Sequence, residues 1–129
     1  MKYMLLCYSD EKSYAEGERE ECMAESAALT HQLHREGKYL LASPLHPVAT
    51  ATSVRVRQGK RLVTDGPFAE TREQLGGFYV LECKDIDEAA EWAAKAPGAQ
   101  FGSVEVRPLW DKDLMAAVEA ARERGYLRK

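Results

Sequence analysis

The chain has 129 residues, 45% of them hydrophobic and 30% charged, which is typical of one soluble globular domain with a sizeable core. Its net charge of −3 comes from 18 basic and 21 acidic residues mixed along the chain, which excludes the basic stripe that nucleic-acid binding needs. No run approaches the roughly 20 apolar residues of a membrane span. The cysteines form no C-x-x-C pair, so neither a zinc knuckle nor a thioredoxin-type site is supported.

The first half of the chain predicts strand, helix and strand. Residues 3–8 are nearly all apolar and predict a buried strand. This run is too short for a signal peptide and acidic residues follow it at once, so we expect a cytoplasmic protein. A helix is predicted over residues 18–36, because four residues share one stripe at 100° per residue. A second strand follows over residues 38–45. The stripe consists of Cys22, Ser26, Leu29 and Leu33.

A β-hairpin is predicted next. Residues 52–57 alternate cleanly, with valines on one face and arginines on the other. Gln58-Gly59-Lys60 turns the chain, and residues 61–65 return it.

The remaining elements repeat the first pattern. A strand is expected over residues 77–83, and Gly76-Gly77 at its start indicates a bulge or close backbone packing. Asp85 and Glu88 predict a capping box for a helix that stops before Pro97. A strand over residues 103–107 and a helix over residues 111–124 complete the chain. The three cysteines, Cys7, Cys22 and Cys83, are expected in the core, with one reactive thiol as the alternative.

Without the hairpin, this order is the ferredoxin-like split βαβ motif, an antiparallel sheet with two helices on one face. We expect an α+β fold, βαββαβ with an inserted hairpin, in a single domain with a core to about residue 109 and a C-terminal helix over about 111–125. If Arg55, Tyr79 and Glu105 line part of the other face with apolar neighbours, a second copy is its simplest cover. A homodimer of the dimeric α+β barrel type is therefore predicted.

Residues 63–79 concentrate turn residues, charges and aromatics between two predicted strands, which indicates a site. Asp65 begins a turn there, where it either bonds its own backbone or acts as a general base or ligand. Glu70 and Arg72 either bracket a polar ligand or form a solvated pair. Phe68 and Tyr79 either wall a pocket or pack in the core. The predicted ligand-binding residues are His34, Arg55, Phe68, Glu70, Arg72, Gln74 and Tyr79.

The histidines are the other candidates. His46 stands at a strand end and is the best candidate for proton transfer, because an imidazole exchanges protons near neutral pH; a plain loop histidine is the alternative. His34 lies on the flank of its helix and is placed to border a cleft, whereas His31 points away from the apolar stripe. The His31-x-x-His34 spacing lacks a third ligand, so no metal is predicted. No cofactor is predicted either, because no Gly-rich phosphate loop is present.

The segment Asp65-Gly66-Pro67-Phe68-Ala69-Glu70-Thr71 resembles the signature of the DGPF group within the YCII-related family. Residues 47–55 and 73–79 are similar to further segments of that group, and Glu91-Trp92-Ala93-Ala94 to the broader YCII pattern. The resemblance runs from residues 2–6 to residues 102–108. It implies a dimeric α+β barrel with a cleft between sheet and helices or between subunits.

The same resemblance carries functional expectations. Some YCII-like relatives are proposed enzymes with a His–Asp pair, and DGPF-group proteins are often linked with extracytoplasmic-function sigma factors, which implies a stress or regulatory setting. The His–Asp pattern does not map cleanly, because the helix histidine falls near Thr30, His31 and His34 and the Asp-Pro is Ala96-Pro97.

Two functions follow from these patterns, and a purely structural dimer module is a third alternative. The first is a homodimeric protein that binds a small molecule or acts as an accessory protein. The second is a cofactor-independent enzyme that uses His46 and Asp65 as acid and base. The absence of a convincing nucleophile, metal set or cofactor loop favours the first, and proximity of either His46 or His34 to Asp65 would favour the second.

Overall fold

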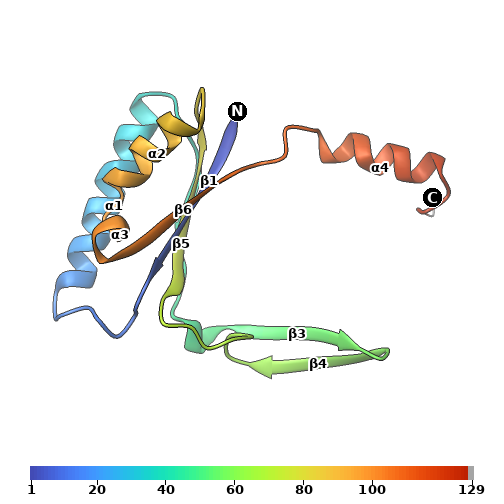
Figure 1. The fold of residues 1–129 in the computed structure, drawn as a ribbon, viewed down its shortest axis with the longest axis horizontal. Helices are drawn as coiled ribbons and strands as arrows, with labels where there is room; N and C mark the ends of the chain where they lie inside the picture. Colours follow the sequence, from blue (N-terminus) through green and yellow to red (C-terminus); the bar gives the residue numbers. More distant parts are fainter. Residues whose placement is uncertain (128–129) are drawn as a thin grey trace.

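The computed structural model describes residues 1–127 (Figure 1). The elements run in the order β1 (Lys2–Ser9), α1 (Glu18–Arg35), β2 (Tyr39–Pro44), a 3-10 turn η1 (Val48–Thr50), β3 (Thr52–Arg57), β4 (Lys60–Asp65), β5 (Gln74–Glu82), α2 (Ile86–Lys95), α3 (Gly98–Phe101), β6 (Gly102–Pro108) and α4 (Leu114–Glu123). None of the helices in this part of the chain is long and apolar enough to cross a lipid bilayer.

Four strands form one antiparallel sheet in the order β2-β5-β1-β6. Helices α1, α2 and α3 lie on the same side of this sheet (Figure 1). Strands β3 and β4 form a separate two-stranded hairpin between β2 and β5. The predicted ferredoxin-like α+β fold with an inserted hairpin is therefore confirmed.

The core lies between the sheet and the helices. Alternation along β1 and β5 turns every second residue toward the helices, among them Leu5 and Leu81, each 1% exposed or less. Leu33 of α1 and Trp92 of α2 meet them from the other side. Full burial of each leucine contributes roughly 1.5–3 kcal/mol, so these contacts fix both helices on this face.

The cap of α2 forms as predicted, but only in one direction. The carboxylate of Asp85 accepts a hydrogen bond from the backbone N–H of Glu88 (2.9 Å). The carboxylate of Glu88 instead pairs with Lys38 at 2.8 Å. The expected capping box is thus half formed, and its second carboxylate joins α2 to the residue before β2.

Within residues 1–127, no helix covers the other face of the sheet (Figure 1). The strand register places Met4, Leu6, Phe78 and Val80 on this face, together with Glu105 as predicted. The predictions for two other residues were wrong. Tyr79 is only 6% exposed and faces the helices, because it follows Phe78 in a strand whose side chains alternate. Arg55 belongs to the hairpin and not to this sheet.

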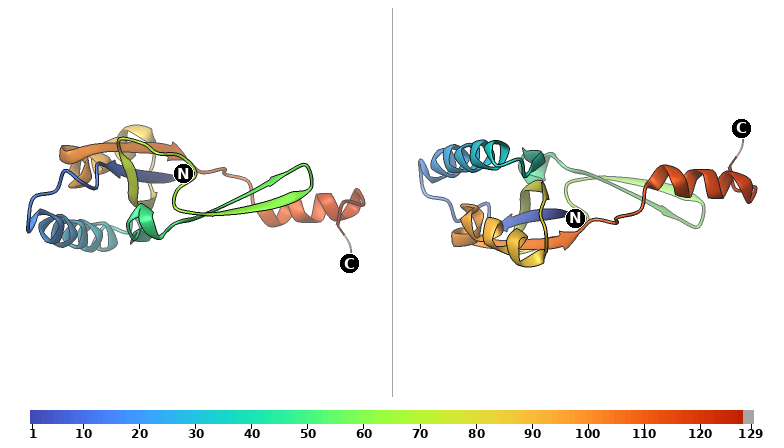
Figure 2. Two further views of the ribbon diagram at one scale, coloured as in Figure 1. Left: turned by 90° about the horizontal axis from the view of Figure 1, so that it is seen from below. Right: turned by 90° about the horizontal axis from the view of Figure 1, so that it is seen from above.

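The hairpin and the C-terminal helix project from the body on the side of the uncovered face (Figures 1 and 2). Helix α4 begins at Leu114, later than the predicted residue 111, because the carboxylate of Asp113 caps it by accepting the Met115 N–H (2.9 Å).

Candidate functional site

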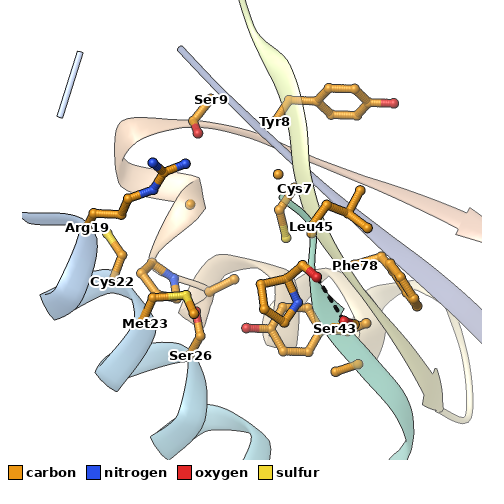
Figure 3. A pocket seen from close by; sticks show the side chains of 18 of the residues that line it. Cys7, Tyr8, Ser9, Arg19, Cys22, Met23, Ser26, Ser43, Leu45 and Phe78 are labelled. Atoms are coloured by element: carbon orange, nitrogen blue, oxygen red, sulfur yellow. Dashed lines mark hydrogen bonds between the residues drawn. The ribbon is translucent and has the colours of Figure 1, made fainter. Parts of the chain in front are cut away.

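A cavity of about 850 Å³ opens between α1 and the strands β1, β2 and β5 (Figure 3). Residues 96–98, where α2 passes into α3, form part of its wall, and residues 43–47 border it where β2 ends. Its surface is mostly apolar. The apolar side chains include Cys7, Cys22, Met23, Ala27, Ala42, Leu45 and Pro97.

Small residues bring the cavity walls close together. A side chain at Gly77 would place its Cβ 3.1 Å from the backbone oxygen of Ser43 and 3.3 Å from Cα of Pro44. Gly76 lies at a bulge, since the pairing of β1 with β5 shifts register between Cys7 and Tyr8. The Gly-Gly pair thus marks both a bulge and a close backbone approach, as predicted from the sequence.

Helix α1 contributes a polar line to this wall. Cys22, Ser26 and Thr30 follow at intervals of four residues and therefore share one face (Figure 3 labels Cys22 and Ser26). The hydroxyl of Thr30 donates to the backbone oxygen of Ser26 (2.8 Å), so it is held by its own helix. Burial raises the pKa of Tyr79, and a hydrogen bond with the Ser26 side chain offsets part of that rise. Ser26 and Tyr79 therefore offer neutral hydroxyl groups inside the cavity.

Hydrogen bonds order the rim of the cavity. The backbone N–H of Glu11 donates to Oε1 of Gln74 (3.0 Å), and Oε1 of Glu11 accepts the N–H of Val48 (3.0 Å). The hydroxyls of Ser9 and Tyr14 lie 2.9 Å apart. The loop after β1 is thereby tied to η1, next to His46. Gln74, predicted to bind ligand, holds this loop and is not among the lining residues.

The two cysteines of the cavity are poor nucleophiles. Burial raises the pKa of Cys7 to about 11. Burial also raises the pKa of Cys22, and the nearby acidic side chains of Glu25, Glu18 and Glu21 raise it further. Because the thiolate is the reactive form, neither residue suits covalent catalysis at neutral pH. Cys83 is buried in the core, whereas the other two line a cavity.

The predicted site residues fall into three groups. His46 and Tyr79 line the cavity. His34 is exposed, and its ring lies 5.6 Å from that of Tyr39. The remainder surround the hairpin base and do not line the cavity: Arg55, Asp65, Phe68, Glu70 and Arg72.

Only one residue of the proposed catalytic pair lines the cavity. Asp65 is the last residue of β4 and is exposed, while His46 borders the cavity. Phe68 is 76% exposed, and its backbone oxygen accepts a hydrogen bond from Nη2 of Arg55 (3.3 Å). The residues predicted to form one site thus divide between the cavity, the base of the hairpin and, for His34, the exposed side of α1.

Several residues of the cavity were missed by sequence reasoning, namely Glu11, Tyr14, Arg19, Ser26 and Thr30. Ser26 carried a usable signal, because it is a hydroxyl residue on the apolar stripe of its helix. The others come from the loop after β1 and the flank of α1, where no local pattern marks a site.

Fold and cavity together define a ferredoxin-like α+β protein with one helix and three strands enclosing a space of small-molecule size. Residues 1–113 match the YCII-related domain, and the chain belongs to that family. It is also 40% identical over 114 residues to an uncharacterized protein of Rhizobium meliloti (strain 1021), covering 84% of this chain and 92% of that protein.

A solved structure of similar fold is 5-chloro-2-hydroxyhydroquinone dehydrochlorinase from Burkholderia phenoliruptrix AC1100, in complex with 2,5-dihydroxybenzoquinone. The TM-score is 0.50 with 15% sequence identity, and the match covers 89% of this chain and 98% of that one. At this identity the likeness concerns the fold.

Proposed function

We propose that this protein is a homodimer that binds a small organic molecule in the cavity between α1 and the sheet. The observation that carries the proposal is the cavity itself. Its volume of about 850 Å³ falls within the roughly 300–1,000 Å³ of ligand pockets. Ligand pockets are mostly apolar with a few polar groups that converge on the ligand, and this lining follows that pattern.

The lining also suggests a class of ligand. Tyr79, Met23 and Pro97 offer flat or adaptable apolar surface, which suits a ring-sized body. Ser26 and Tyr79 offer neutral hydroxyls that both donate and accept hydrogen bonds, which suits a hydroxyl or carbonyl substituent. Arg19 lines the cavity as a cation that suits an acidic group. Two carboxylates, Glu11 and Glu20, line it too, and Oε1 of Glu11 accepts the N–H of Val48. A hydroxylated aromatic acid combines these features.

A filling variant tests the cavity directly. Binding of a panel of hydroxybenzoates is measured by calorimetry on the wild type and on Ala27→Trp, which puts an indole into the cavity from α1. The control is Ala28→Trp, the same change one residue further, at an exposed position outside the lining. We expect binding to the wild type and the control, and at least about tenfold weaker binding to Ala27→Trp. Equal affinity of both variants would place the ligand elsewhere.

A second candidate function is a cofactor-independent enzyme, and the position of His46 on the cavity favours it. The imidazole would act as acid or base on the bound molecule. Asp65, exposed on β4, is its proposed partner only if another subunit brings it there. His46→Gln would then abolish turnover of a bound molecule while leaving its affinity unchanged. Retained turnover in that variant would exclude this histidine.

An accessory role linked to stress or sigma-factor regulation follows from the DGPF resemblance alone. In such a role, we expect binding of a ligand in the cavity to be the signal that the protein passes to the sigma factor. We also expect the protein to act in the cytoplasm. Co-purification of a sigma factor with the tagged protein from its native host, lost in Ala27→Trp, is the corresponding test.

A further inference from the structure

Two arms project from the body beside the uncovered face of the sheet (Figures 1 and 2). The hairpin arm comprises β3 and β4, and the helix arm comprises residues 110–127 with α4. All hairpin residues except Ser53 are exposed. On α4 only Val118 and Ala121 are half-buried. Neither arm packs on the core of its own chain.

Arms of this kind are unstable by themselves. A lone two-stranded hairpin is marginally stable in water, and so is a helix of fewer than roughly 12 residues. The hairpin has six residues in each strand and α4 has 10. Both expose apolar side chains, for example Val54 (59%), Val63 (52%) and Leu114 (67%). Packing against another surface is therefore needed to hold each arm in its observed conformation.

The uncovered sheet face between the arms is suited to a copy of itself. Its centre is apolar, with Met4, Leu6 and Val80 in register on neighbouring strands. The charged residues around this centre are two bases and two acids, Lys2, Arg107, Glu82 and Glu105. In a two-fold pair the same patch meets itself, and a patch with equal numbers of both charges can match its own opposite charges.

The arms leave from opposite ends of the sheet. The hairpin lies between the end of β2 and the start of β5, next to the end of β1, whereas α4 follows β6 at the start of β1. A two-fold axis that reverses the strand direction therefore brings the hairpin of one copy to the helix arm of the other. A two-fold axis that preserves it brings like arms together.

Charge selects the first arrangement. The hairpin arm carries four bases and one acid, Asp65, a net charge of +3, so two hairpins together would gather a net charge of +6. The helix arm carries four acids and three bases, a net charge of −1, and one of its acids, Glu119, is paired with Arg122 at 3.0 Å. Net charges of opposite sign therefore meet only when the arms are unlike. The same pairing sets the valine face of the hairpin, which also carries Arg61, against the Leu114–Val118 stripe of α4, while the other three bases lie on the opposite face.

We propose that the two arms clasp a second copy of this chain, the hairpin of each subunit packing on the helix arm of its partner. This clasp adds to the pairing of the uncovered sheet faces and is separate from ligand binding in the cavity. The dimer is held at both ends as well as at its centre.

Sedimentation of the full chain tests the clasp. We expect a particle of about twice the 14.5 kDa chain mass. Val63→Gln in the hairpin and Val118→Gln in α4 should each raise the dimer dissociation constant by about tenfold or more, because a buried valine is lost. The controls are Thr64→Gln, on the opposite face of the hairpin from Val63, and Ala120→Gln, on the opposite face of α4 from Val118. Dimers of both controls should dissociate like the wild type.

A third variant separates the clasp from the sheet pairing. Val80→Glu puts a charge at the centre of the sheet face and should give a monomer. If it does so while both arm variants dissociate like the wild type, the sheets pair without the clasp and the proposal is overturned. A monomeric wild type at micromolar concentration overturns it as well. Neither result bears on binding in the cavity, which calorimetry measures separately.

Cross-linking tests which arms meet. The variant with both Val56→Cys and Val118→Cys is treated with a short bismaleimide and compared with each single variant and with the wild type, whose own thiols give the background. We expect a covalent dimer only in the double variant. A covalent dimer of Val56→Cys alone, or none in the double variant, would overturn the pairing of unlike arms.

Discussion

The Nζ atom of Lys38 lies 2.8 Å from Oε1 of Glu88 and joins the residue before β2 to the first turn of α2. The hydrogen bond from Lys38 lowers the pKa of Glu88 below its ordinary value of 4.5. The same hydrogen bond raises the pKa of Lys38 above 10.5. Each group is thus more readily charged in the folded protein than in the unfolded chain.

This pair predicts a specific pH dependence of stability. A lowered carboxyl pKa stabilises the fold above its unfolded value, and the contribution is lost as the pH falls through the folded value. The raised pKa of Lys38 also stabilises the fold, and this contribution is lost as the pH rises above about 10.5. In urea unfolding, the free energy of unfolding should therefore fall less between pH 5 and pH 3 for Glu88→Gln than for the wild type. Glu91→Gln, an exposed acid of the same helix, should follow the wild type.

Truncating Leu33 should leave a cavity in the core and lower the free energy of unfolding. Its side chain is fully buried between α1 and the sheet, so Leu33→Ala removes contacts on all sides. We expect a loss of about 2–5 kcal/mol in the free energy of unfolding, measured by urea denaturation. His31→Ala on the exposed face of the same helix should change it by less than about 0.5 kcal/mol. Equal losses would mean that α1 does not pack as described.

The glycine pair predicts a contrast between neighbours. In Gly77→Ala the new methyl group meets backbone atoms of Ser43 and Pro44 at 3.1 and 3.3 Å. Backbone atoms yield little, so we expect about 1–3 kcal/mol of destabilisation. In Gly76→Ala the closest atom is 3.9 Å away, which is an ordinary contact, and stability should change less. The reverse order in thermal unfolding would contradict the bulge geometry.

Cys7 predicts slow thiol chemistry. With its pKa raised to about 11, only a small fraction is thiolate at pH 8. Alkylation by iodoacetamide, followed by peptide mass spectrometry, should be on the order of 100-fold slower than for a thiol in an unfolded peptide, and should accelerate with rising pH. Rapid alkylation of Cys7 at pH 7 would show that the residue is neither buried nor inert.

Tyr79 predicts how the cavity discriminates between ligands. Tyr79→Phe removes a hydroxyl that Ser26 contacts and preserves the ring. A hydroxylated aromatic acid should then bind about 5–20-fold more weakly, since one buried hydrogen bond is lost. An analogue without the hydroxyl should bind both proteins alike. Calorimetry on the two proteins gives the comparison, and an equal loss for both analogues would indicate altered packing instead.

Local chemistry was enough to predict most of the fold. The alternation in β3, the cap at Asp85 and the bulge at Gly76-Gly77 depend on side chains a few residues apart. The sequence of β5 likewise placed Phe78 and Val80 opposite Tyr79. The error for Tyr79 was to assign that alternation to the wrong face, which depends on where the helices lie.

The site was predicted less well, because it is assembled from segments far apart in the chain. Residues 63–79 were predicted to form a site because of their turn chemistry, yet residues 66–73 connect the hairpin to β5. The cavity instead draws Glu11 from a loop, Ser26 from α1 and His46 from the connection after β2. The periodicity of a single segment does not predict which distant segments will lie side by side in the fold.

Taken alone, the amino-acid order determined the kinds and order of the main helices and strands, since hydrophobic period, caps and turns act over a few residues, but it did not predict the short helices η1 and α3 or the starts of β5 and α4. Only the tertiary structure decided that His46 and Tyr79 share a cavity, that Asp65 stands apart from it, and that two arms extend beyond the core. These relations arise when α1 packs on the sheet and β5 is placed between β1 and β2, so they depend on contacts between residues distant in sequence.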